Sequence, residues 1–145
     1  MLSIIKKATL SVFKADVGSI GGHTKPDEKM LSLARYLVLT AIETGLILDG
    51  FVTHTGDDIA FNILHIHGVN SSKIHDWILD CFKALTKLAE ELGMYAAGQD
   101  INHNAPSGNV RGAGPGAAEL EFELLPKHRP AETVLIFTAD KCGPG

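Results

Sequence analysis

One amphipathic stripe between residues 72 and 92 constrains this fold more than any other feature. Apolar side chains recur there at i, i+3, i+4 and i+7, which is the spacing of one helix face: Ile74, Trp77, Ile78, Cys81, Phe82, Leu85, Leu88, Ala89 and Leu92. Ser71 or Ser72 can cap the start of this helix, and Gly93 ends it. Burial of one large apolar side chain contributes roughly 1.5–3 kcal/mol. The helix must therefore dock on a sheet to be stable.

A second helix and five strands accompany this helix in the sequence. Pro26, Asp27 and Glu28 suit a first helical turn, and Gly45 is the expected stop. Runs of β-branched and apolar residues predict strands at 7–16, 46–54, 59–67, 117–125 and 133–140. The order β-α-β-β-α-loop-β-β predicts one α/β domain over residues 1–145, with mixed, largely antiparallel strands and helices covering one face of the sheet.

Composition excludes several classes of protein. The net charge of −4 gives no basic footprint, so nucleic acid is not an expected partner. No stretch reaches the roughly 18 apolar residues of a membrane span, and the N-terminus does not resemble a signal peptide. Cys81 and Cys142 form no disulfide framework or CxxC site, and Cys81 falls on the apolar helix stripe. We expect a cytoplasmic protein without membrane contact.

Aspartates follow three of the expected strands. They are Asp16 after the first strand, Asp57 and Asp58 at a hairpin turn, and Asp140 after the last strand. His23, Gln99 and Lys141 lie beside or near these ends in sequence. A single aspartate at a strand end is ordinary turn chemistry. Several carboxylates in one place need cations, however, and Mg²⁺ prefers oxygen ligands completed by substrate phosphate. The pattern favours a metal site that hydrolyses phosphate esters.

The histidines allow a zinc alternative. His65 and His67 alternate onto one face of the expected strand 59–67, and His54 lies on the neighbouring arm. Imidazoles bind zinc together with a carboxylate, so a zinc hydrolase remains open. Ordinary hydrogen-bonded strand histidines are the other interpretation.

The glycine-rich segment "SGNVRGAGPGA" contains a G-x-G-x-x-A pattern at 112–117. A dinucleotide site needs a strand before this pattern and a helix after it, whereas a polar loop precedes it and strand-like alternation follows. A backbone-amide site for an anion fits better, because glycines let the backbone approach a phosphate closely. Gly108, Asn109, Gly112 and Gly114 are its candidate residues.

Five motifs together carry a resemblance to a known family: "KADVGSIGGH", "THTGDD", "ELGMYAAGQD", "SGNVRGAGPG" and "FTADK". In this order, over the whole chain, they resemble the bifunctional fructose 1,6-bisphosphate aldolase/phosphatases of archaea and deeply branching bacteria. The resemblance implies a gluconeogenic enzyme that joins dihydroxyacetone phosphate to glyceraldehyde 3-phosphate and then removes the 1-phosphate. It also implies a layered α-β-β-α sandwich, a homo-octamer and Mg²⁺ as the cofactor.

The resemblance also implies roles for individual residues. The magnesium ligands it suggests are Asp16, His23, Asp57, Asp58, Gln99 and Asp140, with Asp16 also the catalytic proton acceptor. The substrate contacts it suggests are His23, Tyr95, Gly108, Asn109 and Lys141.

Length is the one large departure from this family. Its members are much longer, and their Schiff-base lysine, its tyrosine partner and further aspartate ligands lie beyond Gly145. We therefore expect an N-terminal fragment of the family fold, in which no residue carries the aldolase step. A non-catalytic fragment that binds metal or sugar phosphate is the alternative function.

Overall fold

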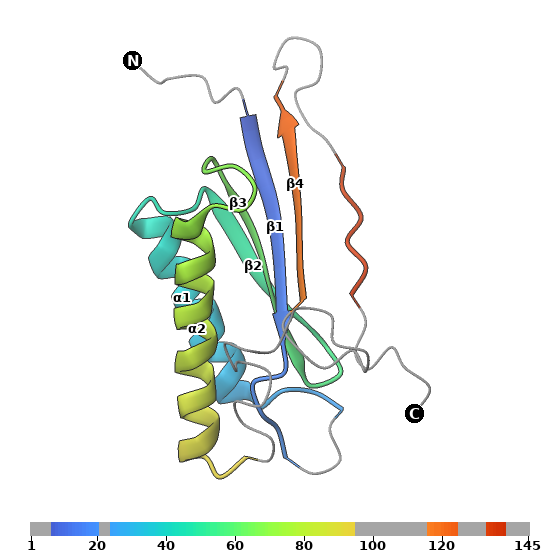
Figure 1. Cartoon of the computed structure of the whole chain (residues 1–145). Helices are drawn as coiled ribbons and strands as arrows, with labels where there is room; N and C mark the ends of the chain where they lie inside the picture. The colour runs from blue at the N-terminus through green and yellow to red at the C-terminus, as the bar shows by residue number, and fades with distance from the viewer. Residues whose placement is uncertain (1–6, 21–23, 95–115, 125–132, 139–145) are drawn as a thin grey trace.

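The computed structural model describes residues 7–20, 24–94, 116–124 and 133–138. These residues form four strands and two helices in one helix layer and one sheet (Figure 1). The strands are β1 (Lys7–Ala15), β2 (Asp49–Thr55), β3 (Asp58–His65) and β4 (Gly116–Glu123), and the helices are α1 (Glu28–Glu43) and α2 (Ser72–Glu91). The α/β class and the antiparallel pairing are confirmed.

The sheet has the strand order β2-β3-β1-β4, and every neighbouring pair is antiparallel. β1 lies between β3 and β4, with Ser11 opposite Ile63 on one side and Glu119 on the other. β2 and β4 are therefore the edge strands of the described sheet. Because pairing fixes which residues share a face, this register decides which side chains meet the helices.

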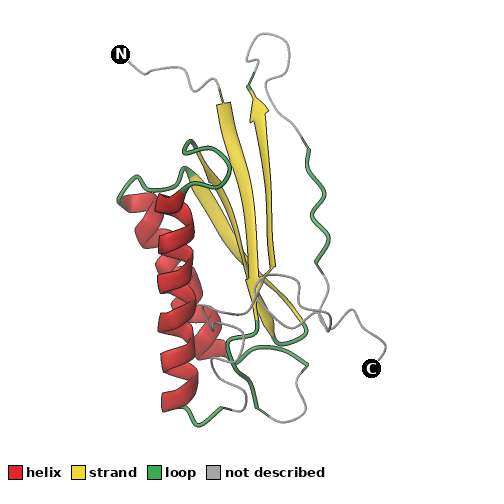
Figure 2. Ribbon diagram, in the orientation of Figure 1, coloured by secondary structure: helices red, strands yellow, loops and turns green. Residues whose placement is uncertain are grey.

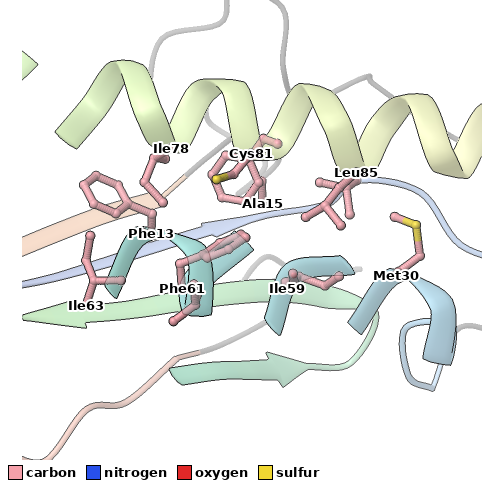
Figure 3. Packing of buried hydrophobic residues seen from close by; sticks show 14 of the residues in the cluster. Phe13, Ala15, Met30, Ile59, Phe61, Ile63, Ile78, Cys81 and Leu85 are labelled. Carbon is pink, nitrogen blue, oxygen red and sulfur yellow. The ribbon is translucent and has the colours of Figure 1, made fainter. Parts of the chain in front are cut away.

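Both helices cover the same face of the sheet (Figure 2). The stripe predicted from sequence is buried: Ile74, Leu85 and Ala89 of α2 have no exposed surface. They pack on the inward residues of β1 and β3, with Phe61 at the centre (Figure 3). The Phe61 ring meets Phe82 edge-on at 5.5 Å between centroids and Trp77 at 6.0 Å. This helix–sheet interface is the hydrophobic core of the described residues.

The helix ends follow the expected signals closely. The Asp27 side chain accepts a hydrogen bond from the Lys29 backbone N–H at 2.8 Å, which caps α1. Gly45 and Gly93 follow α1 and α2 with positive φ angles, as expected for helix stops. Ser71 is the N-cap residue of α2, but its side chain makes no capping hydrogen bond.

Gly50 lets α1 approach β2 closely. A methyl group at Gly50 would lie 3.1 Å from both the Val38 Cγ1 atom and the Asn62 backbone oxygen. Such contacts are too tight without movement of the helix or of β3. Glycine therefore avoids a tight packing contact at this position.

The last predicted strand, 133–140, is wrong as far as the described residues show. Residues 133–138 are described, but they join no strand ladder. They run along the sheet face opposite the helices (Figure 1) and enclose with it a groove of about 420 Å³. Leu10, Val12, Lys14 and Leu120 line the groove on the sheet side. Residues 134–138 face the sheet across this groove and form no backbone ladder with it. This apolar, β-branched segment is therefore not a strand.

Neither described helix combines the length and apolar character that a membrane-spanning helix requires. Cys81 is a core residue as expected, since it is 2% exposed. Its burial, with the charge of Asp80, raises the pKa of the thiol to about 12. Cys142 lies outside the described residues.

Candidate functional site

The end of β1 and the β2–β3 turn bring aspartates to the same end of the sheet. Ala15, the last residue of β1, pairs with Ile59 of β3. Asp16 therefore follows β1 at the level where Asp58 begins β3, and Asp57 lies in the turn just before it. Two of the three strand ends that the sequence predicts to converge do so.

Asp57 and Asp58 are almost completely buried, with 2% and 4% of their surfaces exposed. Burial of a carboxylate is costly unless charge or hydrogen bonds compensate. For Asp58, the Lys14 ammonium is a direct partner in an ion pair from β1 to β3. Only 17% of the Lys14 side chain is exposed, so this pair is poorly screened by solvent.

Asp57 and Asp16 are each held by a local donor. The Ser19 hydroxyl donates to the Asp57 carboxylate at 2.7 Å, and Ser19 is itself buried. The Gly18 backbone N–H donates to Asp16 at 3.1 Å, which fixes the first turn after β1. These bonds orient the two carboxylates from the loop that follows β1.

Lys14 and Ser19 are site residues that sequence reasoning missed. Lys14 looked like one polar position in an alternating strand, and Ser19 like part of a glycine-rich loop. Lys14 could have been found from the face of the sheet on which its side chain lies. It is directly opposite Ala60 of β3, and Asp58 is two residues before Ala60 and so on the same face of the sheet.

Residue 138 also reaches this end of the sheet. The Thr138 hydroxyl lies in hydrogen-bonding contact with the Thr55 hydroxyl, at the end of β2. The chain therefore approaches the hairpin turn two residues before Asp140. The described part of the C-terminal segment thus runs toward the same place as the end of β1.

The remaining predicted site residues lie outside the described residues. They are His23, Tyr95, Gln99, Gly108, Asn109, Asp140 and Lys141. Within the described ranges, no three His, Cys, Asp or Glu side chains are grouped so that they could hold a metal ion. The described part of the site is a set of buried carboxylate oxygens, which is the donor type that Mg²⁺ prefers.

The zinc alternative is wrong for the described histidines. His54 pairs with Ile59, six residues along β3 from His65, a separation of about 20 Å at the usual rise of a strand. Both ring nitrogens of His65 are engaged, by the Ser11 hydroxyl and the His67 backbone N–H. The His67 ring bonds to the Leu46 backbone oxygen at 2.9 Å. These histidines have structural partners and do not converge.

The dinucleotide interpretation of residues 112–117 is also excluded at its C-terminal side. Gly116 and Ala117 begin strand β4, where a dinucleotide fingerprint requires a helix. The groove beside residues 133–138 is lined mainly by apolar side chains. It therefore does not suit a charged sugar phosphate, and the aspartate end of the sheet remains the candidate site.

Comparison with known proteins identifies the family of this chain. The model of the fructose-1,6-bisphosphatase family matches residues 7–145, which is nearly the whole chain. The chain belongs to this family. Its similar relatives carry the name fructose-1,6-bisphosphate aldolase/phosphatase, so the family resemblance seen in the five motifs is confirmed.

The relatives come from several organisms. The protein from Sulfurisphaera tokodaii is 44% identical over 139 residues, covering 96% of this chain and 35% of the relative. The protein from Ignicoccus hospitalis is 44% identical over 140 residues, covering 97% of this chain and 35% of the relative. The protein from Thermus thermophilus is 42% identical over 139 residues, covering 96% of this chain and 37% of the relative. The chain thus spans about a third of the length of the curated relatives it matches.

Proposed function

We propose that this chain is the N-terminal part of a cytoplasmic, magnesium-dependent fructose 1,6-bisphosphate phosphatase that is also an aldolase in gluconeogenesis. The observation that carries the proposal is the burial of Asp57 and Asp58 together at the hairpin turn, beside the end of β1. Two adjacent buried carboxylates are costly to keep for structure alone. Relatives named for this pair of activities align with the chain over almost its whole length.

Each described aspartate has a distinct place in this proposal. The carboxylate oxygens of Asp57 and Asp58 would be metal ligands, held in place at the turn because Ser19 bonds to Asp57 and Lys14 pairs with Asp58. Asp16, which is less buried, accepts a proton during phosphate ester hydrolysis. His23, Gln99 and Asp140 would complete the ligand set around Mg²⁺. Bound there, Mg²⁺ would offset the phosphate charge and stabilise the attacking and leaving oxygens.

The substrates are the sugar phosphates expected for this family. Tyr95, Gly108, Asn109, Lys141 and His23 would contact fructose 1,6-bisphosphate or the two triose phosphates from which it forms. The aldolase lysine would lie in a segment beyond these 145 residues, and the assembled protein would be a homo-oligomer, an octamer. Lys14 is an additional cation at this end of the sheet, where it pairs with Asp58.

A non-catalytic module that binds metal or sugar phosphate is the second candidate. It is favoured by one observation, namely that the chain spans only about a third of the length of the relatives it matches. Calorimetric titration of the chain with Mg²⁺ and fructose 1,6-bisphosphate, combined with a turnover assay, distinguishes the enzyme from the non-catalytic module. Binding without phosphate release would support the module.

The function is tested most fairly in a protein that contains every part of the family fold. We suggest a chimera in which this chain replaces the matching segment of the Sulfurisphaera tokodaii relative, to which it is 44% identical. Phosphate release from fructose 1,6-bisphosphate is measured with and without Mg²⁺, and condensation of the triose phosphates is measured separately. We expect Mg²⁺-dependent phosphate release. A folded chimera that condenses the trioses but releases no phosphate would refute the phosphatase role of this chain.

A further inference from the structure

A second polar cluster lies inside the helix–sheet interface, away from the aspartates. It joins Ser11 of β1, His65 of β3, Glu119 of β4 and His75 of α2. Ser11 and His65 have no exposed surface, and the Glu119 side chain is 9% exposed. The cluster therefore connects three strands through buried polar groups, and the His75 side chain, which is 39% exposed, joins it to α2.

The hydrogen bonds of this cluster have one consistent direction. The His67 backbone N–H donates to His65 Nδ1 at 3.2 Å, so Nδ1 carries no proton. The proton of neutral His65 is therefore on Nε2, which donates to the Ser11 hydroxyl oxygen at 2.8 Å. Ser11 in turn donates to Glu119 Oε2 at 2.6 Å. Glu119 Oε1 accepts from the Asn70 backbone N–H at 3.0 Å and from His75 Nε2 at 2.7 Å.

This direction excludes a nucleophilic role for Ser11, although a Ser–His–Glu set suggests one. A catalytic histidine must accept the serine proton on a free ring nitrogen. Here His65 Nε2 is a donor toward Ser11, and the serine proton points to Glu119. The cluster is consequently a structural connection whose donors and acceptors match only when His65 is neutral and Glu119 is ionised.

β4 depends on this connection more than the other strands do. Every residue of β4 is exposed or only partly buried, so the strand gains little from apolar burial. Among the described residues it is an edge strand that pairs with β1 alone. Glu119 supplies its polar contacts to the helix side, through Asn70 and His75 at the start of α2.

We propose that Ser11, His65, Glu119 and His75 form an acid-sensitive tether that holds edge strand β4 to β1 and α2, and that loosens when His65 takes a second proton. A proton on Nδ1 removes the acceptor of the His67 backbone N–H. It also places a cation beside the His67 ring, which is stacked on His65 at 5.8 Å between centroids. This tether does not depend on the proposed activity, because none of its residues lies at the aspartate end of the sheet.

The groups that face His65 favour its neutral form overall. Burial, followed by charge repulsion from His67, lowers the pKa of His65 from its ordinary value of 6.5. The Glu119 carboxylate of β4 opposes this shift, and His75 of α2 adds to it. The folded state binds this proton less readily than the unfolded state does. The contribution of neutral His65 to the free energy of unfolding is therefore fully present above about pH 6.5. It falls as the pH drops below that value, and the loss is complete below the lower pKa of the folded state.

Amide hydrogen exchange of β4 as a function of pH tests the tether. After correction for intrinsic exchange, we expect the protection of the β1–β4 amides to fall between pH 7.5 and pH 5.5, by at most about tenfold per pH unit for one proton. A Ser11→Ala variant should show low β4 protection already at pH 7.5 and a weaker pH dependence. A His54→Asn variant is the matched control, because His54 is an exposed strand histidine outside the cluster, and it should match the wild type.

Two results would overturn the proposal. One is β4 protection that does not change between pH 7.5 and pH 5.5, or that falls only as much as the protection of the α1 and α2 core. The other comes from ¹⁵N NMR of wild-type histidine side chains, which needs no variant to fold. A proton on Nδ1 of neutral His65, in place of Nε2, would contradict the hydrogen-bond direction on which the tether rests.

Discussion

The ion pair between Lys14 and Asp58 offers a quantitative test of the site. We consider Lys14→Met, Asp58→Asn and the double variant, measured without added metal. The Lys14 side chain is 17% exposed and that of Asp58 is 6% exposed. Loss of one partner costs roughly 3–5 kcal/mol in a fully buried pair, whereas an exposed pair contributes roughly 0.2–1 kcal/mol. The partial exposure of Lys14 places this pair somewhat below the buried limit.

We therefore expect Lys14→Met to lower the free energy of unfolding by about 2–3 kcal/mol. The double variant should cost less than the sum of the single variants, with a coupling energy of about 1–2 kcal/mol. Lys7→Met is the matched control, because Lys7 lies on the same strand and pairs with Glu121 at 3.3 Å in a solvent-exposed ion pair. It should cost no more than about 0.5 kcal/mol.

Urea denaturation at pH 7 measures all four variants, and its repetition in millimolar Mg²⁺ connects the result to the site. In the proposed site, Mg²⁺ would offset the charge of Asp58 as the Lys14 ammonium does. Mg²⁺ should then stabilise Lys14→Met more than the wild type. The reasoning is refuted if Lys14→Met costs no more than Lys7→Met, or if the double-variant cycle shows no coupling.

Three further predictions concern the core. Gly50→Ala should lower the free energy of unfolding by about 1–3 kcal/mol, because the added methyl group overpacks against α1. Gly116→Ala has open space around the added methyl group and should cost little, and thermal unfolding compares the two variants. Leu85→Ala should lower the free energy of unfolding by about 3–5 kcal/mol, against about 0.5 kcal/mol or less for the exposed Leu39→Ala, and equal effects in urea denaturation would contradict the assigned core. Cys81, with its pKa raised to about 12, should react with a thiol reagent at pH 8 only after unfolding. The label is located by peptide mapping, since the chain also contains Cys142, and rapid labelling of Cys81 in the folded chain would be inconsistent with its burial.

The sequence predicted those features that depend on local periodicity. The stripe of α2 has the helical spacing over its full length, and Leu85 and Phe82 are buried as that spacing requires. The Gly-Asp-Asp turn between β2 and β3 was identified because turn residues separate two apolar runs. In these segments, local preference and tertiary packing agree.

The sequence could not predict contacts that depend on the register between distant strands. Ser11 and Glu119 are 108 positions apart, and only the β1–β4 ladder brings them together. The alternation of strand 59–67 places His65 and His67 on one face, but it does not identify Ser11 as the partner of His65. The segment 133–138 has the composition of a strand, but it lies along the face of the sheet and pairs with no strand there. Strand propensity alone does not determine whether a segment finds a strand with which to pair.

The central claim is that the buried turn aspartates serve phosphate hydrolysis, and phosphate release by Asp57→Asn tests it most directly. The measurement uses the chimera with the Sulfurisphaera tokodaii relative, fructose 1,6-bisphosphate and saturating Mg²⁺. Asp27→Asn, a change in the partly exposed α1 cap, is the control for loss of a carboxylate. The account predicts that Asp57→Asn folds and loses at least about a hundredfold in kcat/KM, as expected when a group that stabilises the transition state is removed. Asp27→Asn should remain near wild type, and an Asp57→Asn protein as active as Asp27→Asn would contradict the account.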